Sequence, residues 1–175
     1  MKIPKAEAST ILRCGLILYP SQDQAIDKVL SSLMEKIPAQ YILLADSSGQ
    51  VISVSGKREQ ADPVALGALV ASDMAASQEM AHLTGEVQNY NMILREGPEI
   101  NTWIVNAGPN LVLMFKVSSD VPLGWTRLVI RRAAELIAEI ADAPVEEEPS
   151  ESSLDIDQVD FSSEIDKSLE ELWRM

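Results

Sequence analysis

Hydrophobic positions recur at helical spacing in three segments of the chain and as short runs in five others. Helices are predicted over Asp23–Ile37, between Asp62 and Gly85, and over Leu123–Ala141, where apolar residues follow a 3.6-residue period. The apolar runs predict strands at Tyr41–Ala45, Val51–Val54, Tyr90–Leu94, Asn101–Val105 and Leu111–Val117, each bounded by turn-forming residues. The order α-β-β-α-β-β-β-α predicts an α+β sandwich over residues 21–141, with a five-stranded antiparallel sheet.

The middle helix is apolar on two sides. Asp62 is a favourable N-cap, Pro63 suits the first helical position, and Gly85 can end the helix. One apolar arc contains Leu66, Leu69, Val70 and Met80, and the second contains Val64, Ala68, Ala71 and Ala75. A helix that covers one face of a sheet needs only one apolar stripe. The second arc therefore favours a dimer interface, at which its small residues let the helix of a symmetry mate approach closely. The alternative is a helix buried more deeply in its own domain.

Residues 1–20 form an N-terminal extension. Within it, Thr10–Tyr19 is apolar and is interrupted by Arg13. The segment is far shorter than the ~20 apolar residues that cross a bilayer, so membrane insertion is not expected. We expect it to form a buried strand or a docking arm, and as a strand it could add an extra edge to the sheet.

Residues 142–175 have a different composition and carry 12 acidic and 2 basic side chains, whereas residues 1–141 carry 15 and 12. This acidic, proline-interrupted composition predicts a mostly disordered tail. Near its end, residues 162–174 show the spacing of a short amphipathic helix. Its apolar residues form a hypothetical docking motif: Phe161, Ile165, Leu169, Leu172 and Trp173. The alternative is a solvated tail that docks on nothing.

Little in the composition points to catalysis. The chain has one cysteine, Cys14, which favours a reducing compartment, and we expect a cytoplasmic protein. The sequence contains no lysine- or arginine-rich patch that would bind the phosphates of a nucleic acid, so nucleic-acid binding is not expected. His82 is the only histidine, and phosphate-binding glycine loops and calcium-loop spacings are absent, so no catalytic, cofactor or metal site is predicted. An enzyme is therefore not expected.

Three arginines near the start of the last predicted helix allow two interpretations. Arg127, Arg131 and Arg132 could supply an arginine finger to a phosphoryl-transfer reaction in a partner. They could equally form a solvated helix face paired with Glu135 and Glu139, and this second interpretation is favoured.

The segment Leu44–Gly56, with its strand ending in D-x-x-G, resembles the roadblock (dynein light chain) family, most closely its bacterial MglB-type members. The small-residue-rich helix that follows, Arg95-Glu96-Gly97, and the start of the last helix at Leu123 are similar to that family as well. The resemblance covers about residues 23–141 and implies a homodimer. In such a dimer the long second helices lie side by side and the middle strands pair across the two-fold axis.

The resemblance also implies a function. MglB-type proteins bind a small Ras-like GTPase through the face of the paired long helices and promote GTP hydrolysis without donating a catalytic arginine. Other branches of the family are scaffolds or adaptors. The leading hypothesis is therefore a non-catalytic regulator of a small Ras-like GTPase, and the alternative is a homodimeric scaffold or adaptor with no effect on GTP hydrolysis.

Overall fold

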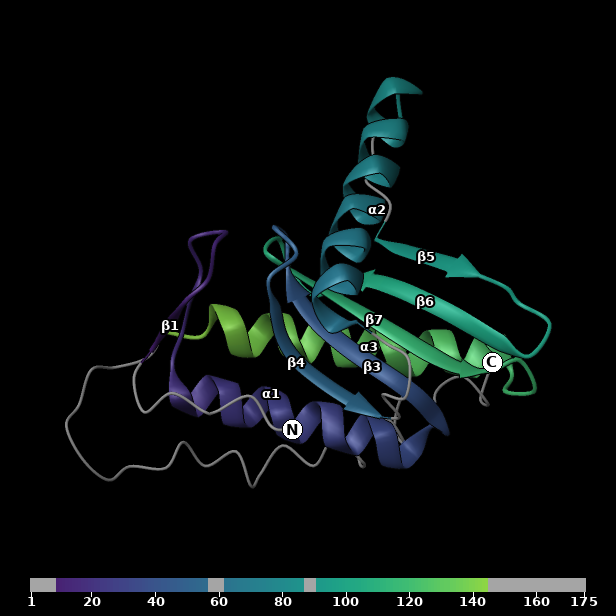
Figure 1. Ribbon diagram of the computed structural model, residues 1–175, viewed down its shortest axis with the longest axis horizontal. Coiled ribbons are helices and arrows are strands. Elements are labelled where there is room, and N and C mark those ends of the chain that lie inside the picture. Colours follow the sequence, from purple (N-terminus) through teal and green to yellow (C-terminus); the bar gives the residue numbers. More distant parts are fainter. Residues whose placement is uncertain (1–8, 57–61, 87–90, 145–175) are drawn as a thin grey trace, which may run out of the picture.

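A five-stranded antiparallel sheet forms the middle layer of the molecule (Figure 1). A computed structural model describes residues 9–56, 62–86 and 91–144. The sheet has the order β4-β3-β7-β6-β5. Its strands are β3 (Ala39–Asp46), β4 (Val51–Gly56), β5 (Met92–Arg95), β6 (Ile100–Asn106) and β7 (Leu111–Ser118). The three long helices are α1 (Pro20–Lys36), α2 (Pro63–Leu83) and α3 (Leu123–Asp142). The predicted α+β class and element order are confirmed.

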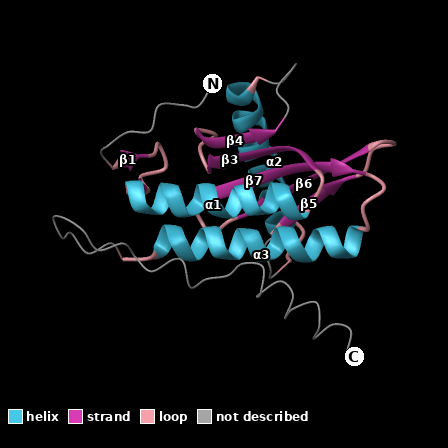
Figure 2. Cartoon of the chain, turned by 90° about the horizontal axis from the view of Figure 1, so that it is seen from below, coloured by secondary structure: helices cyan, strands magenta, loops and turns pink. Residues whose placement is uncertain are grey.

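The helices lie on both faces of the sheet. Helices α1 and α3 run side by side on one face, and α2 crosses the other face and projects past the sheet (Figures 1 and 2). Strand β3 is buried on both sides, because Ile42 and Leu44 belong to the core under α1 and α3 whereas Leu43 belongs to the core under α2. This alternation follows from the two-residue period of a strand.

Gln22 joins the start of α1 to the end of α3. Its side-chain oxygen accepts a hydrogen bond from the Tyr19 N–H at 3.0 Å. Its Nε2 lies 2.8, 3.3 and 3.2 Å from the carbonyl oxygens of Ile140, Ala141 and Ala143. The last carbonyls of a helix lack partners within it, and here a buried side chain satisfies them.

The N-terminal segment forms a small hairpin of its own and not an edge strand of the main sheet. Strand β1 (Thr10–Ile11) pairs antiparallel with β2 (Ile17–Leu18). A turn between them is closed by a hydrogen bond from the Leu12 N–H to the Leu16 carbonyl, and Gly15 within it has φ +90°. Leu12 and Leu18 are buried in the core under α1 and α3. The expected extra edge strand is thus corrected, since this turn folds the segment back on itself.

The turn between β3 and β4 (Asp46–Gln50) receives contacts from the hairpin. The Arg13 N–H donates to Gln50 Oε1 at 3.0 Å, and the Cys14 N–H donates to Asp46 Oδ2 at 3.2 Å. Asp46 Oδ1 accepts from the Ser48 N–H, the Ser48 hydroxyl and the Gln50 N–H at 2.6–2.9 Å. Burial alone would raise the pKa of Asp46, but these hydrogen bonds outweigh it and hold the pKa below its ordinary value.

The same turn touches α2, backbone to backbone. A Cβ atom added at Gly67 would lie 2.6 Å from the Gly49 carbonyl oxygen and 2.7 Å from Val51 Cγ2, and one added at Gly49 would lie 2.7 Å from the Ala68 Cα. Gly49 also has φ +88°, which favours glycine. Neither position has room for a side chain, so the two glycines set how closely α2 approaches the sheet.

Replacing Asp46 by alanine should lower the free energy of unfolding by about 1–3 kcal/mol at neutral pH, because three backbone N–H groups lose their acceptor. Because the pKa of folded Asp46 is depressed, its contribution is present above the ordinary pKa of about 4 and is lost as pH falls below it. Urea unfolding of both proteins at neutral and acidic pH, at fixed protein concentration, measures this. Asp120→Ala, in an exposed turn, is the control and should cost less. An equal loss at both positions would contradict the role given to Asp46.

Replacing Gly67 by alanine should destabilise the protein by about 1–3 kcal/mol through overpacking, although alanine is the better helix former. Gly124→Ala in α3 is the matched control, because an added Cβ there meets nothing within 4 Å. That change should be neutral or stabilise by up to about 1 kcal/mol. Thermal unfolding of both variants gives the comparison, and a Gly67 variant as stable as the control would argue against close packing at this point.

Candidate interaction surface on helix α2

Helix α2 begins and ends where the sequence predicts. Asp62 Oδ1 accepts hydrogen bonds from the N–H groups of Val64 and Ala65 at 3.0 and 3.3 Å. At the other end, the Gly85 N–H donates to the His82 carbonyl and the Glu86 N–H donates to the Ala81 carbonyl. Gly85 has φ +76°, so this pair of bonds is a Schellman motif. Both ends of the helix are therefore fixed by local sequence.

The inward face of α2 consists mainly of small residues. Its buried members are Gly67, Val70, Ala71, Met74, Ser77 and Ala81. The apolar arc that includes Val70 was expected to form one continuous stripe, but Leu69 and Met80 of that arc are 66% and 57% exposed. The physical reason is the close approach at Gly67, which favours small side chains against the sheet and leaves large ones outside.

The four residues predicted to form a dimer interface therefore do not lie on one surface of α2. Val64, Ala68 and Ala75 are exposed on one side of α2, whereas Ala71 is 7% exposed and packs inward. We call the three exposed residues the small-residue strip. That they contact a second copy stays a prediction.

A second exposed strip follows α2 on the side nearer β5. It consists of Leu69, Met80 and Leu83, which we call the large-residue strip. Residues 69 and 80 are three helical turns apart and so lie on one side. Seven large hydrophobic side chains are exposed among the described residues, and Val64 and the large-residue strip account for four of them. Helix α2 is therefore the element that leaves most apolar surface uncovered within the described chain.

A half-open cavity of about 620 Å³ lies between the first half of α2 and the sheet. Leu66 and Leu69 form part of its helical wall, and Thr102 and Lys116 line it from neighbouring strands. At its rim, Arg95 Nη2 of β5 lies 2.8 Å from Asp73 Oδ1 of α2. The pair is partly exposed, so it contributes little free energy, but it shows which side of α2 faces β5.

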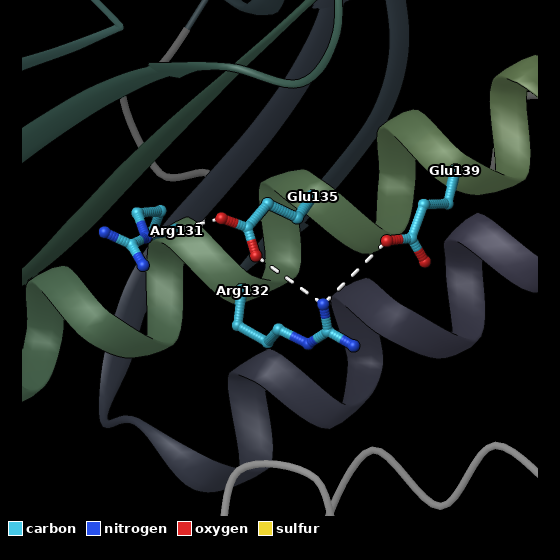
Figure 3. A network of polar contacts seen from close by, with 4 residues as sticks. All are labelled: Arg131, Arg132, Glu135 and Glu139. Atoms are coloured by element: carbon cyan, nitrogen blue, oxygen red, sulfur yellow. Dashed lines mark ion pairs between the residues drawn. The ribbon is translucent and has the colours of Figure 1, made fainter. Parts of the chain in front are cut away.

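The arginines of α3 lie on the opposite face of the molecule from α2. Arg131 Nε is 3.3 Å from Glu135 Oε1, and Arg132 Nη1 is 3.5 Å from Glu135 Oε2 and 3.9 Å from Glu139 Oε1 (Figure 3). Arg127 is exposed. The favoured interpretation of a charged helix face is confirmed for Arg131 and Arg132.

Titratable groups do not gather into a reactive cluster in the ranges that the structure describes. No group of three or more histidine, cysteine, aspartate or glutamate residues there could hold a metal ion. His82 is exposed near the end of α2, and Cys14 lies half-buried in the hairpin turn. None of the helices among these residues combines the length and apolar character needed to cross a membrane. The tail motif from Phe161 to Trp173 lies outside the described residues.

Similar proteins were found only by structure. No protein-family model matches the chain, and none of the curated proteins matches it either. The chain is similar to the solved structure of Myxococcus xanthus MglB, with a TM-score of 0.68 and 27% identity, over 77% of this chain and 100% of that one. It is also similar to a structure described as MglB with tetrameric arrangement, with a TM-score of 0.65 and 30% identity, over 72% of this chain and 94% of that one.

A roadblock domain from Streptomyces avermitilis shares the fold, with a TM-score of 0.52 and 16% identity over 66% of this chain and 90% of that one. The similarity to the two MglB structures extends over nearly their whole length, at 27% and 30% identity. The chain belongs to the roadblock family and is close to MglB.

Proposed function

We propose that this protein is a non-catalytic regulator of a small Ras-like GTPase and that it acts as a homodimer. The observation that carries the proposal is the exposed apolar surface of α2, which a monomer leaves in water. The likeness to MglB supports a regulatory protein, and the MglB-type resemblance supplies the class of partner.

The dimer interface that we propose combines the outer edge of β5 with the large-residue strip. Within the described residues, β5 pairs only with β6, so its other edge is able to pair with a second β5 across a two-fold axis. The ion pair between Asp73 and Arg95 lies on the side of α2 nearer this edge, and the same side carries the large-residue strip. Two such helices would then lie side by side and cover Leu69 and Met80.

The small-residue strip is the GTPase-binding surface in this proposal. Val64, Ala68 and Ala75 are exposed on the side of α2 away from the cavity, and they would face outward from a pair of α2 helices. Small side chains allow a partner's backbone to approach closely. The MglB-type resemblance implies that the regulator would act on groups that the GTPase itself carries.

Charged substitutions should distinguish the two strips. Leu69→Glu should dissociate the dimer, because it would bury an unpaired carboxylate in the proposed interface, whereas Ala75→Glu should leave the dimer intact. Light scattering at tens of micromolar gives the mass, with the wild type expected near twice 19.2 kDa or a multiple of it. Dissociation by Ala75→Glu alone would instead place the small-residue strip in the dimer interface, as the spacing of its small residues predicts. A monomeric wild type would contradict both of these dimer interfaces.

Adding the protein to a small Ras-like GTPase encoded near it in the same genome should change the rate of GTP hydrolysis, and the protein alone should hydrolyse none. Ala75→Glu should reduce that change while leaving the dimer mass as it is. Binding without any change in hydrolysis would favour the scaffold or adaptor alternative. If neither binding nor stimulation occurred with the wild type, the proposed function would be wrong for that GTPase.

Alanine substitution of Arg127, Arg131 or Arg132 should lower any stimulation by far less than the ~10³–10⁵-fold that an arginine finger supplies. Their helix covers the sheet face opposite α2, and Arg131 and Arg132 already contact glutamates of α3. Single-turnover hydrolysis with each variant provides the measurement. A loss of that size at one position would identify a finger and move the GTPase to the α3 face.

A further inference from the structure

Two isoleucines leave a separate apolar surface on the N-terminal hairpin. Ile11 and Ile17 are cross-strand partners in β1 and β2, and they are 71% and 42% exposed. Directly opposed residues of an antiparallel pair project from the same face, so the two side chains form one patch. We call it the hairpin patch. Apart from Leu123, these are the only exposed large hydrophobics of the described chain that lie outside α2.

The hairpin patch is held in place by the fold. Leu12 and Leu18 on the inward side are buried at 3% exposure each, and the turn donates hydrogen bonds to Asp46 and Gln50. Binding of a segment to the patch therefore carries little entropic cost for ordering the hairpin.

The described chain ends beside this hairpin. Gln22 contacts the Ala143 carbonyl oxygen with its Nε2 and the Tyr19 N–H with its Oε1, so the end of α3 lies next to the residue that follows β2. Ile17 is two residues before Tyr19, at most about 7 Å along the chain. The segment 145–160 contains 16 residues, and an unstructured chain of that length has a root-mean-square span of roughly 20–24 Å. The tail motif that follows them thus starts within reach of the hairpin patch.

The charges of the two chain ends are complementary. Residues 145–175 contain 11 acidic and 2 basic side chains, whereas residues 1–13 contain 3 basic and 1 acidic. Arg13, two residues after Ile11, is exposed in the hairpin turn. Attraction between the ends would raise the local concentration of the tail at the hairpin, most strongly at low ionic strength.

We propose that the hairpin patch is the docking site for the apolar residues of this chain's own tail, Phe161, Ile165, Leu169, Leu172 and Trp173. The inference does not rest on GTPase regulation.

Disulfide trapping in the full-length protein tests the proposal. In a Cys14→Ser background, Thr10→Cys is combined with Ser168→Cys, which leaves both isoleucines and every apolar residue of the motif in place. Asp120→Cys with Ser168→Cys is the matched control, because Asp120 is exposed in the turn before α3, at the opposite end of that helix from the hairpin. Non-reducing electrophoresis separates an internal disulfide from a covalent dimer.

The internal disulfide at Thr10→Cys should form at least about tenfold faster than at Asp120→Cys, as expected for a locally concentrated tail. Adding Ile11→Ser and Ile17→Ser should reduce the rate to that of the control, and high salt should slow trapping. Unfolding curves should be unchanged by the serine pair, since both isoleucines are exposed. Equal rates at the two positions would overturn the proposal, and so would indifference to the serine pair. A predominant covalent dimer would show that the occupant is the tail of a second copy.

Discussion

Contact between the backbone of α2 and the backbone of the β3–β4 turn determines how the rest of the molecule is arranged. Gly67 and Gly49 meet with no side chain between them, and a Cβ on either would fall under 3 Å from the other segment. The first half of α2 is thereby held close to the sheet, and the second half extends past it (Figure 1). The turn itself is fixed by Asp46, which also holds the N-terminal hairpin. One turn therefore contacts both α2 and the hairpin, which together carry most of the exposed large hydrophobic side chains among the described residues.

These surfaces explain why we assign the protein a role in binding. The close approach of α2 places small residues against the sheet, so large apolar residues that would ordinarily face inward remain outside. Exposed apolar strips of this kind on a helix are typical of contacts with other proteins. Arg131 and Arg132 of α3, by contrast, form ion pairs with glutamates of the same helix (Figure 3).

Much of the fold was predictable because its signals are local. Asp62 and Gly85 mark the ends of α2 through hydrogen bonds to residues within five positions, and Gly49 marks the β3–β4 turn. The position of the hairpin was harder to predict, because it depends on hydrogen bonds from Arg13 and Cys14 to residues more than 30 positions away. The side of α2 that faces the sheet was not predictable for the same reason. It depends on Gly67 meeting Gly49, and periodicity alone gave two equivalent arcs.

Hydrogen–deuterium exchange of the full-length protein, alone and with a GTP-loaded Ras-like GTPase, tests the central claim that α2 is the interaction surface. The exchange rate of each backbone amide reports local opening, and a bound partner slows it where contacts form. If α2 is the interaction surface, added protection concentrates in Pro63–Leu83, and the exchange rates of α1 and α3 are unchanged. Protection confined to α1 and α3, with α2 exchanging as in the protein alone, would contradict it.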